Sequence, residues 1–166
     1  YSFDAAVNGA RVIRVPRRDD FTLDVSGIEI AVTEHAPKLL FLASPNNPDG
    51  GLLSESDLRR LLALPLVIVL DEAYIEFSGS GNSRLLWSLK HPNLIVLRTF
   101  SKWAGLAGLR VGYGAFPSNL LTHVWKIKQP YNVSVAATVA ALASLEDQER
   151  LHQIVAQIVQ ERDRLD

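Results

Sequence analysis

Short apolar runs alternate along the chain with segments whose apolar positions recur at helical spacing. Five runs have the length and composition of β-strands, since each is rich in leucine, isoleucine, valine or aromatic residues. They lie at residues 11–15, 38–43, 66–74, 93–98 and 110–116. The run at residues 38–43 is apolar almost throughout, which is typical of a strand in a sheet covered on both faces.

Five helices are predicted between and after these runs, at residues 54–64, 84–90, 118–128, 134–145 and 147–165. Ser54 and Asp57 resemble a capping box at the start of the first, and Pro92 stops the second. In the last helix one face is apolar and is formed by Leu151, Ile154, Val155, Ile158 and Val159. Alternating strands and helices indicate an α/β fold with a mainly parallel sheet and right-handed crossovers.

The composition fits one ordinary globular domain and excludes several classes of protein. The chain has 166 residues, of which 48% are hydrophobic and 21% charged. Its formal charge of -1 and the lack of a basic stripe argue against nucleic acid as a partner. The apolar stretch at residues 61–70 is broken by Pro65 and is too short to span a membrane. The chain starts at Tyr1 and has no methionine, so we expect it to begin inside a longer gene product.

Polar clusters follow three successive strands at the point where each strand ends. They consist of Asn46 and Asn47, of Asp71 and Tyr74, which follow the apolar part LVIVL of the run at residues 66–74, and of Thr99, Ser101 and Lys102. Ligands of open parallel sheets bind beyond the carboxyl ends of the strands, where the loops share one rim. Each cluster alone has an ordinary interpretation as a turn, a cap or a solvated lysine. Their joint occurrence predicts a binding site.

The polar side chains at these strand ends match what an aldehyde cofactor held as a Schiff base requires. Such a cofactor needs a lysine amine, a carboxylate beside its ring nitrogen, and a phosphate anchor. Lys102 would supply the amine and Asp71 the carboxylate. Arg110, aided by the hydroxyl groups of Thr99 and Ser101, would hold the phosphate. Asn47 and Tyr74 could donate hydrogen bonds to the phenolic oxygen of the cofactor. No cysteine is present and the histidines are scattered, so no metal site is expected.

Three blocks, SPNNPDG, VLDEAYIEF and RTFSKWAGLAGLRVGYG, resemble the signature segments of histidinol-phosphate aminotransferases, and the resemblance covers essentially the whole chain. It implies the fold of the large domain of fold type I enzymes, a three-layer sandwich, with pyridoxal 5'-phosphate as the cofactor. It also implies that Lys102 carries the cofactor, that Asp71 contacts the ring nitrogen, and that Ser101 and Arg110 bind phosphate. Asn47 and Tyr74 would contact the phenolic oxygen, and Tyr1 would stack on the ring.

The same resemblance implies transamination between L-histidinol phosphate and 2-oxoglutarate, a homodimer, and a cytoplasmic or plastid enzyme. Residues 1–166 would form the central part of the large domain, without the N-terminal segment and the C-terminal small domain of the family. Asp49 departs from the threonine usual in the family, and Trp103 from a smaller or basic residue. We expect Trp103 to pack into the core.

Four alternatives differ in the chemistry that they assign. A strand ending in Asp-Glu also occurs in P-loop nucleotidases, but the chain has no GxxxxGK segment. An aromatic aminotransferase or a threonine-phosphate decarboxylase would use the same lysine and aspartate. A noncatalytic aminotransferase-like sensor domain would also retain this core. Activity with a 2-oxo acid acceptor would distinguish an enzyme from a sensor.

Overall fold

A computed structural model describes residues 1–165 and contains one four-stranded sheet in the order β1-β2-β3-β4. The strands are β1 (Leu39–Ala43), β2 (Val67–Asp71), β3 (Leu94–Thr99) and β4 (Gly112–Ala115). The first three are parallel, and β4 pairs with β3 in the antiparallel direction. The prediction of an α/β fold with a mainly parallel sheet is confirmed.

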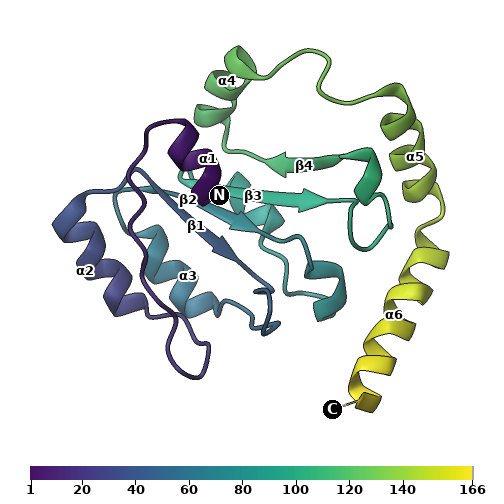
Figure 1. The fold of residues 1–166 in the computed structure, drawn as a ribbon, viewed down its shortest axis with the longest axis horizontal. Helices are drawn as coiled ribbons and strands as arrows, with labels where there is room; N and C mark the ends of the chain where they lie inside the picture. Colours follow the sequence, from purple (N-terminus) through teal and green to yellow (C-terminus); the bar gives the residue numbers. More distant parts are fainter. Residues whose placement is uncertain (166) are drawn as a thin grey trace.

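Helices lie on both sides of this sheet and beyond its β4 edge. They are α1 (Ser2–Val7), α2 (Val25–His35), α3 (Glu55–Leu62), α4 (Ser118–Ile127), α5 (Val135–Glu146) and α6 (Gln148–Leu165). Three short 3-10 segments lie in the connections between strands. They are η1 (Ile75–Ser78) and η2 (Leu85–Leu89), between β2 and β3, and η3 (Ala107–Leu109), between β3 and β4. In Figure 1 α2 and α3 lie beside β1, whereas the chain from α4 to α6 arches past the opposite edge.

The main core lies between one face of the sheet and helices α2 and α3. Side chains alternate between the two faces of a strand, so every second residue of β1, β2 and β3 points to these helices. The sheet contributes Leu42, Ile68, Leu70, Leu94 and Val96, and the helices contribute Val25, Ile28, Val32, Leu58 and Leu61. This packing fixes the strand ends that carry the predicted site.

The opposite face of β1 is exposed within the described residues, contrary to the prediction of a strand covered on both faces. Leu39 and Phe41 are 52% and 42% exposed. Tyr1, which precedes α1, stacks on Phe41 with the ring centroids 4.5 Å apart. An apolar run shows that a strand can be buried on two faces, but a covering element must be present to bury it.

A second, smaller core holds the loop after β3 against the last two helices. Phe100, Trp103 and Val111 pack with Ala137 and Ala141 of α5 and with Val155 of α6. The Trp103 ring lies 5.6 Å from that of Phe100 and 6.3 Å from that of His152. The prediction that Trp103 packs into the core is confirmed. Since Trp103 directly follows Lys102, this packing anchors the loop that carries the lysine.

Several element predictions were wrong in detail. Residues 11–15 form no strand because they run through an extended connection without a sheet partner, and residues 84–90 contain the 3-10 segment η2 in place of an α-helix. Helix α2 was missed, although Asp24 accepts a hydrogen bond from Gly27 N as an N-cap and Ile28 and Val32 have helical spacing. No helix in residues 1–165 is long and apolar enough to cross a membrane.

Candidate active site

The three predicted polar clusters meet at one rim of the sheet. Strand register places Ala43 beside Asp71 and Asp71 beside Leu97, so β1, β2 and β3 end at nearly the same height. Ser44 N donates to Asp71 O at 2.9 Å, which continues the pairing into the loop after β1. The carboxyl ends of the parallel strands therefore bring residues far apart in sequence into one cluster, as expected for an open parallel sheet.

Asp71 ends β2 with its side chain on the exposed face of the sheet. Its Oδ1 accepts a hydrogen bond from Ala73 N at 3.0 Å, which holds the carboxylate in one orientation. Its Oδ2 accepts from the hydroxyl group of Tyr1. Burial, together with the neighbouring Asp71 carboxylate, raises the pKa of Tyr1 above its ordinary value. Tyr1 therefore remains a neutral donor at neutral pH, and its hydroxyl group helps to hold the Asp71 carboxylate in place.

Asn47, Tyr74 and Lys102 form a second group at the same rim. Asn47 Nδ2 lies 3.4 Å from the Tyr74 hydroxyl oxygen, at the long end of hydrogen-bond range. Lys102 Nζ lies 5.2 Å from the centre of the Tyr74 ring, a distance at which an ammonium group is attracted to the aromatic face. Lys102 is exposed, so its amine is accessible to a ligand. The Asn47 amide and the Lys102 amine thus both lie beside the Tyr74 side chain.

Asp49 shapes the turn that carries Asn47. Asn46 Nδ2 donates to Asp49 Oδ1, and Gly51 N donates to Asp49 Oδ2 at 2.9 Å. These hydrogen bonds, with that from Asn46 the larger influence, lower the pKa of Asp49 below its ordinary value. Asp49 is therefore ionised, and its carboxylate stabilises the turn by accepting hydrogen bonds from Asn46 and Gly51. This role explains how the turn accommodates an acid at this position.

Thr99 and Ser101 form the hydroxyl group pair that was predicted beside Arg110. Thr99 Oγ1 lies 2.9 Å from Ser101 Oγ and accepts from Ser101 N at 3.0 Å. Phe100 N donates to Val111 O, so the backbone next to Arg110 is tied to this loop. The Arg110 guanidinium itself donates to Ala107 O at 3.0 Å. The structure places the backbone of Arg110 by the hydroxyl groups, while its side chain bonds to its own loop.

A cavity of about 550 Å³ opens beside the Asn47 and Tyr74 side chains. Its wall is formed by the turn after β1, by the η1 segment and by α6, including Asn46, Leu52, Phe77, Val159 and Arg162. Its size is within the range of small-molecule pockets, but its lining includes neither Asp71 nor Lys102. The described residues contain no group of three or more His, Asp or Glu side chains placed to hold a metal ion.

The site residues fit an aldehyde cofactor with a pyridine ring and a phosphate. A carboxylate, an amide and phenol pair, an exposed amine and two hydroxyl groups lie at one rim, and these are the donors and acceptors that such a group requires. Two neighbouring acids, Glu72 and Glu76, and Arg98 lie beneath this rim and were not predicted. The sequence feature that could have indicated these residues is an Asp-Glu pair at the end of one buried strand and an arginine at the end of the next.

Comparisons with known proteins identify the family of this chain. The family model described as aminotransferase class I and II matches residues 1–166. The chain is 58% identical over 165 residues to the chloroplastic histidinol-phosphate aminotransferase of Nicotiana plumbaginifolia, covering 99% of the chain and 40% of the relative. It is 56% identical to the histidinol-phosphate aminotransferase of Roseiflexus castenholzii, covering 99% of the chain and 44% of the relative.

A solved structure has the same fold. The histidinol-phosphate aminotransferase of Sinorhizobium meliloti, in complex with pyridoxal-5'-phosphate, superposes with a TM-score of 0.90 at 34% identity, and the match covers 99% of this chain and 46% of that one. The chain spans about two fifths of the length of the curated Nicotiana relative. By its sequence over residues 1–166 and by its fold, the chain belongs to the class I and II aminotransferases.

Proposed function

We propose that this chain forms the pyridoxal 5'-phosphate site of an aminotransferase that converts L-histidinol phosphate and 2-oxoglutarate to imidazole acetol phosphate and L-glutamate. The observation that carries the proposal is the convergence of Asp71, Tyr74 and Lys102, from two neighbouring strand ends, at one rim of the sheet. The choice of substrate is supported by relatives named histidinol-phosphate aminotransferase at 56% and 58% identity.

Each site residue has a role that follows from its chemistry. When bound, pyridoxal phosphate supplies an electron sink that makes the proton on the amine-bearing carbon of the substrate acidic. Asp71 would pair with the protonated ring nitrogen and keep it charged. Lys102 would hold the cofactor through its amine and, once displaced by the substrate amine, would move the proton as a general base and acid.

The remaining residues would bind and orient the cofactor. Tyr74 and Asn47 would donate to the phenolic oxygen, and Tyr1 would lie over the ring. Thr99, Ser101 and Arg110 would hold the phosphate, for which the Arg110 side chain must turn from Ala107 O to a ligand oxygen. Planar guanidinium groups are well suited to phosphate oxygens, so this exchange of acceptor is favourable.

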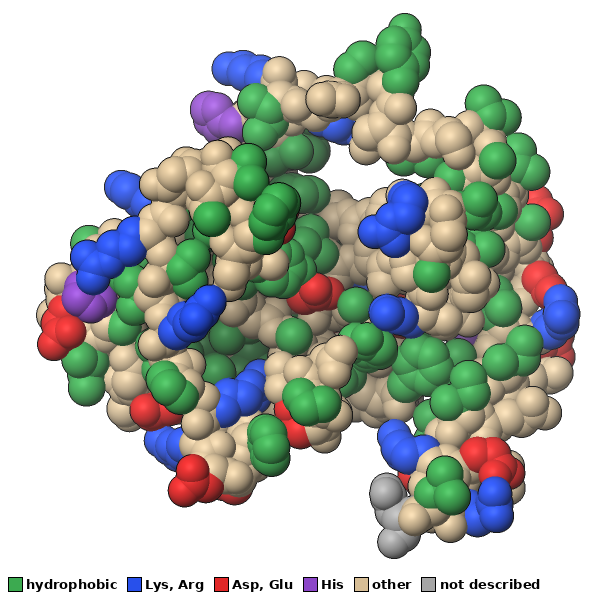
Figure 2. Space-filling view, viewed as in Figure 1, with side chains coloured by type: hydrophobic (Ala, Val, Ile, Leu, Met, Phe, Trp, Pro, Cys, Tyr) green, Lys and Arg blue, Asp and Glu red, His purple; other side chains and the backbone are tan. Residues whose placement is uncertain are grey.

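The partners that we propose are a small amino donor, a 2-oxo acid and a second copy of the protein. Hydrophobic side chains gather over α4 and α5 in Figure 2, and those exposed there include Trp125, Ile127, Val135, Val139 and Leu142. Exposed apolar patches of this kind mark protein interfaces, which supports a homodimer. We place the protein in the cytoplasm, or in the plastid if its source is a photosynthetic eukaryote, as the name of the Nicotiana relative suggests.

The proposal is tested by following glutamate formation from histidinol phosphate and 2-oxoglutarate with the protein as its gene encodes it. We expect turnover that depends on pyridoxal phosphate and is abolished by Lys102→Ala. Lys90→Ala is the matched control, since Lys90 is an exposed lysine away from the rim, and it should have normal activity. Release of carbon dioxide without glutamate from a phosphorylated amino acid would point to a lyase and contradict the proposal.

A further inference from the structure

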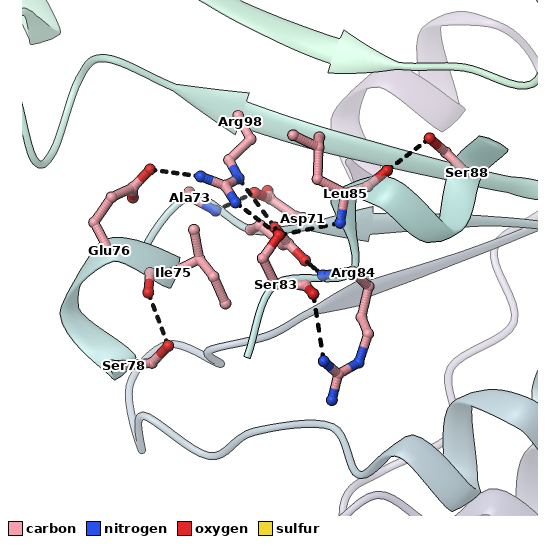
Figure 3. Close-up of polar contacts among 11 residues, drawn as sticks. Asp71, Ala73, Ile75, Glu76, Ser78, Ser83, Arg84, Leu85, Ser88 and Arg98 are labelled. Carbon is pink, nitrogen blue, oxygen red and sulfur yellow. Dashed lines mark hydrogen bonds and ion pairs between the residues drawn. The ribbon is translucent and has the colours of Figure 1, made fainter. Parts of the chain in front are cut away.

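A buried ionic cluster lies directly beneath the proposed cofactor site. Arg98 Nε contacts Glu72 Oε2 at 3.0 Å, and Arg98 Nη1 contacts Glu76 Oε1 at 2.9 Å. Arg98 Nη2 donates to Ser83 Oγ at 2.7 Å, and Ser83 Oγ in turn donates to Glu72 Oε2 at 2.8 Å. Figure 3 shows the Arg98 side chain extending from its strand into the centre of this group.

The alternation of side chains along the strands explains why the cluster and the site lie on opposite faces. Asp71 and Thr99 share the face of Val69 and Leu97, towards the proposed cofactor, because side chains alternate along each strand and the register places Asp71 beside Leu97. Arg98, one residue before Thr99, points to the other face. Glu72 continues from Asp71 with Glu72 N bonded to Leu97 O at 2.9 Å. The cluster therefore supports the site from below without reaching it.

Burial makes the geometry of this cluster restrictive. The side chains of Glu72, Glu76 and Arg98 are 1%, 12% and 14% exposed. Two carboxylates share one guanidinium, and removal of one partner of a buried pair leaves an uncompensated charge. Well-packed apolar side chains often stabilise a fold as well as a buried ion pair does. Stability alone therefore does not account for the cluster. The segments that the cluster connects give a better reason for it.

The cluster joins the two segments that carry the site. Glu72 follows Asp71 directly, and Glu76 lies two residues beyond Tyr74, so the two acids flank the segment that holds both side chains. Arg98 lies four residues before Lys102, on the neighbouring strand. We propose that Arg98 is a positioning residue, which fixes Asp71 and Tyr74 relative to Lys102 by binding Glu72, Glu76 and Ser83. This inference rests on the proposed function of the site.

The test uses the protein as its gene encodes it, loaded with pyridoxal phosphate, and the variants Arg98→Gln and Arg98→Lys. Three quantities are measured: kcat and KM, the pH midpoint of the visible absorbance of the bound cofactor, and the melting temperature. Arg60→Gln is the matched control. It removes an arginine that pairs with Glu29 at 2.8 Å but is half-exposed on α3.

We expect Arg98→Gln to lower kcat by about 100-fold, the effect of a displacement of roughly 1 Å in an active site, with KM little changed. The pH midpoint should rise by roughly half a unit, a threefold change in proton affinity, since a displaced Tyr74 leaves more negative charge on the phenolic oxygen. Arg98→Lys should give intermediate values, because an ammonium group cannot replace the fork of a guanidinium. Arg60→Gln should match the wild type.

A wild-type kcat and pH midpoint in Arg98→Gln would overturn the inference, even if the variant melts at a lower temperature. If Arg98→Gln does not fold, Ser83→Ala decides, because it removes one anchor of Arg98 and a donor to Glu72. It should move the midpoint in the same direction by less, and an unchanged midpoint would refute the positioning role. Ser88→Ala is its control, since Ser88 is a buried serine bonded to Leu85 O. A wild-type protein that fails to bind the cofactor would instead contradict the proposed function.

Discussion

Replacement of Asp71 by asparagine tests the electrostatic role of the site most sharply, because the amide has nearly the same shape as the carboxylate. The amide oxygen of the asparagine would still accept from Ala73 N, which bonds to Asp71 Oδ1 at 3.0 Å. At present the Tyr1 hydroxyl group donates to Asp71 Oδ2. In the variant the new amide nitrogen can instead donate to the Tyr1 oxygen. Exchange of one hydrogen bond for another should change the unfolding free energy by no more than about 1 kcal/mol.

The effect on rate should be much larger. Asp71 is half-buried, so an effective dielectric constant of about 20 applies, at which unit charges about 4 Å apart attract each other by about 4 kcal/mol. Loss of the negative charge removes this attraction for a protonated ring nitrogen. At about 1.36 kcal/mol for each factor of ten, kcat should fall by roughly a thousandfold, while some cofactor remains bound through Lys102 and the phosphate contacts.

The assay is steady-state formation of glutamate with cofactor content and melting temperature measured on the same samples. Asp147→Asn serves as the control, since Asp147 is an exposed acid that pairs with Arg150 at 3.3 Å. It should retain the wild-type rate. A kcat for Asp71→Asn within about tenfold of the wild type, with the cofactor bound, would refute the electron-sink role assigned to this carboxylate.

Two further predictions concern stability. Leu58→Ala, at a fully buried position of α3, should cost about 2–5 kcal/mol in urea unfolding, whereas Leu86→Ala at an exposed position should change it by less than about 0.5 kcal/mol; equal effects would contradict the assignment of the core. Burial raises the pKa of Glu76 above its ordinary value of 4.5 despite the neighbouring Arg98. The contribution of Glu76 to the unfolding free energy is therefore present below pH 4.5 and is lost as the pH rises through the raised pKa. Glu76→Gln should consequently gain stability relative to the wild type as the pH rises above 4.5. A pH-independent difference would be inconsistent with a raised pKa.

The sequence predicted the sheet well because the hydrophobic runs of β1, β2 and β3 are strong and each ends in turn residues. The strand predicted at residues 11–15 failed for a tertiary reason, since RVIRV has the composition of a strand but no partner beside it. Helix α2 was missed because the exposed Ile30 obscures the apolar face that Val25, Ile28 and Val32 form. Local composition indicates what a segment can form, whereas a neighbouring strand or helix decides what it does form.

The site was predicted to the level of residue clusters but not of contacts. The parallel topology alone places Asn47, Asp71 and Thr99 at one rim, because they follow successive strands. No local pattern could indicate that the Arg110 guanidinium donates to Ala107 O. Arg110 has a left-handed backbone with φ 53, and this backbone conformation sets the direction in which its side chain leaves the chain. The Arg98 cluster depends on pairing between strands, so the Asp-Glu pair and the arginine that end two successive runs indicated candidate residues but not their contacts.

The central claim is that Lys102 carries the cofactor, and covalent trapping tests it most directly. The protein and its Lys102→Ala variant would be mixed with pyridoxal phosphate, reduced with borohydride and mapped by mass spectrometry. The proposed site predicts that Lys102 is labelled selectively and that the variant loses this label. Labelling spread over the other lysines, Lys38, Lys90, Lys126 and Lys128, with none at Lys102, would contradict the claim.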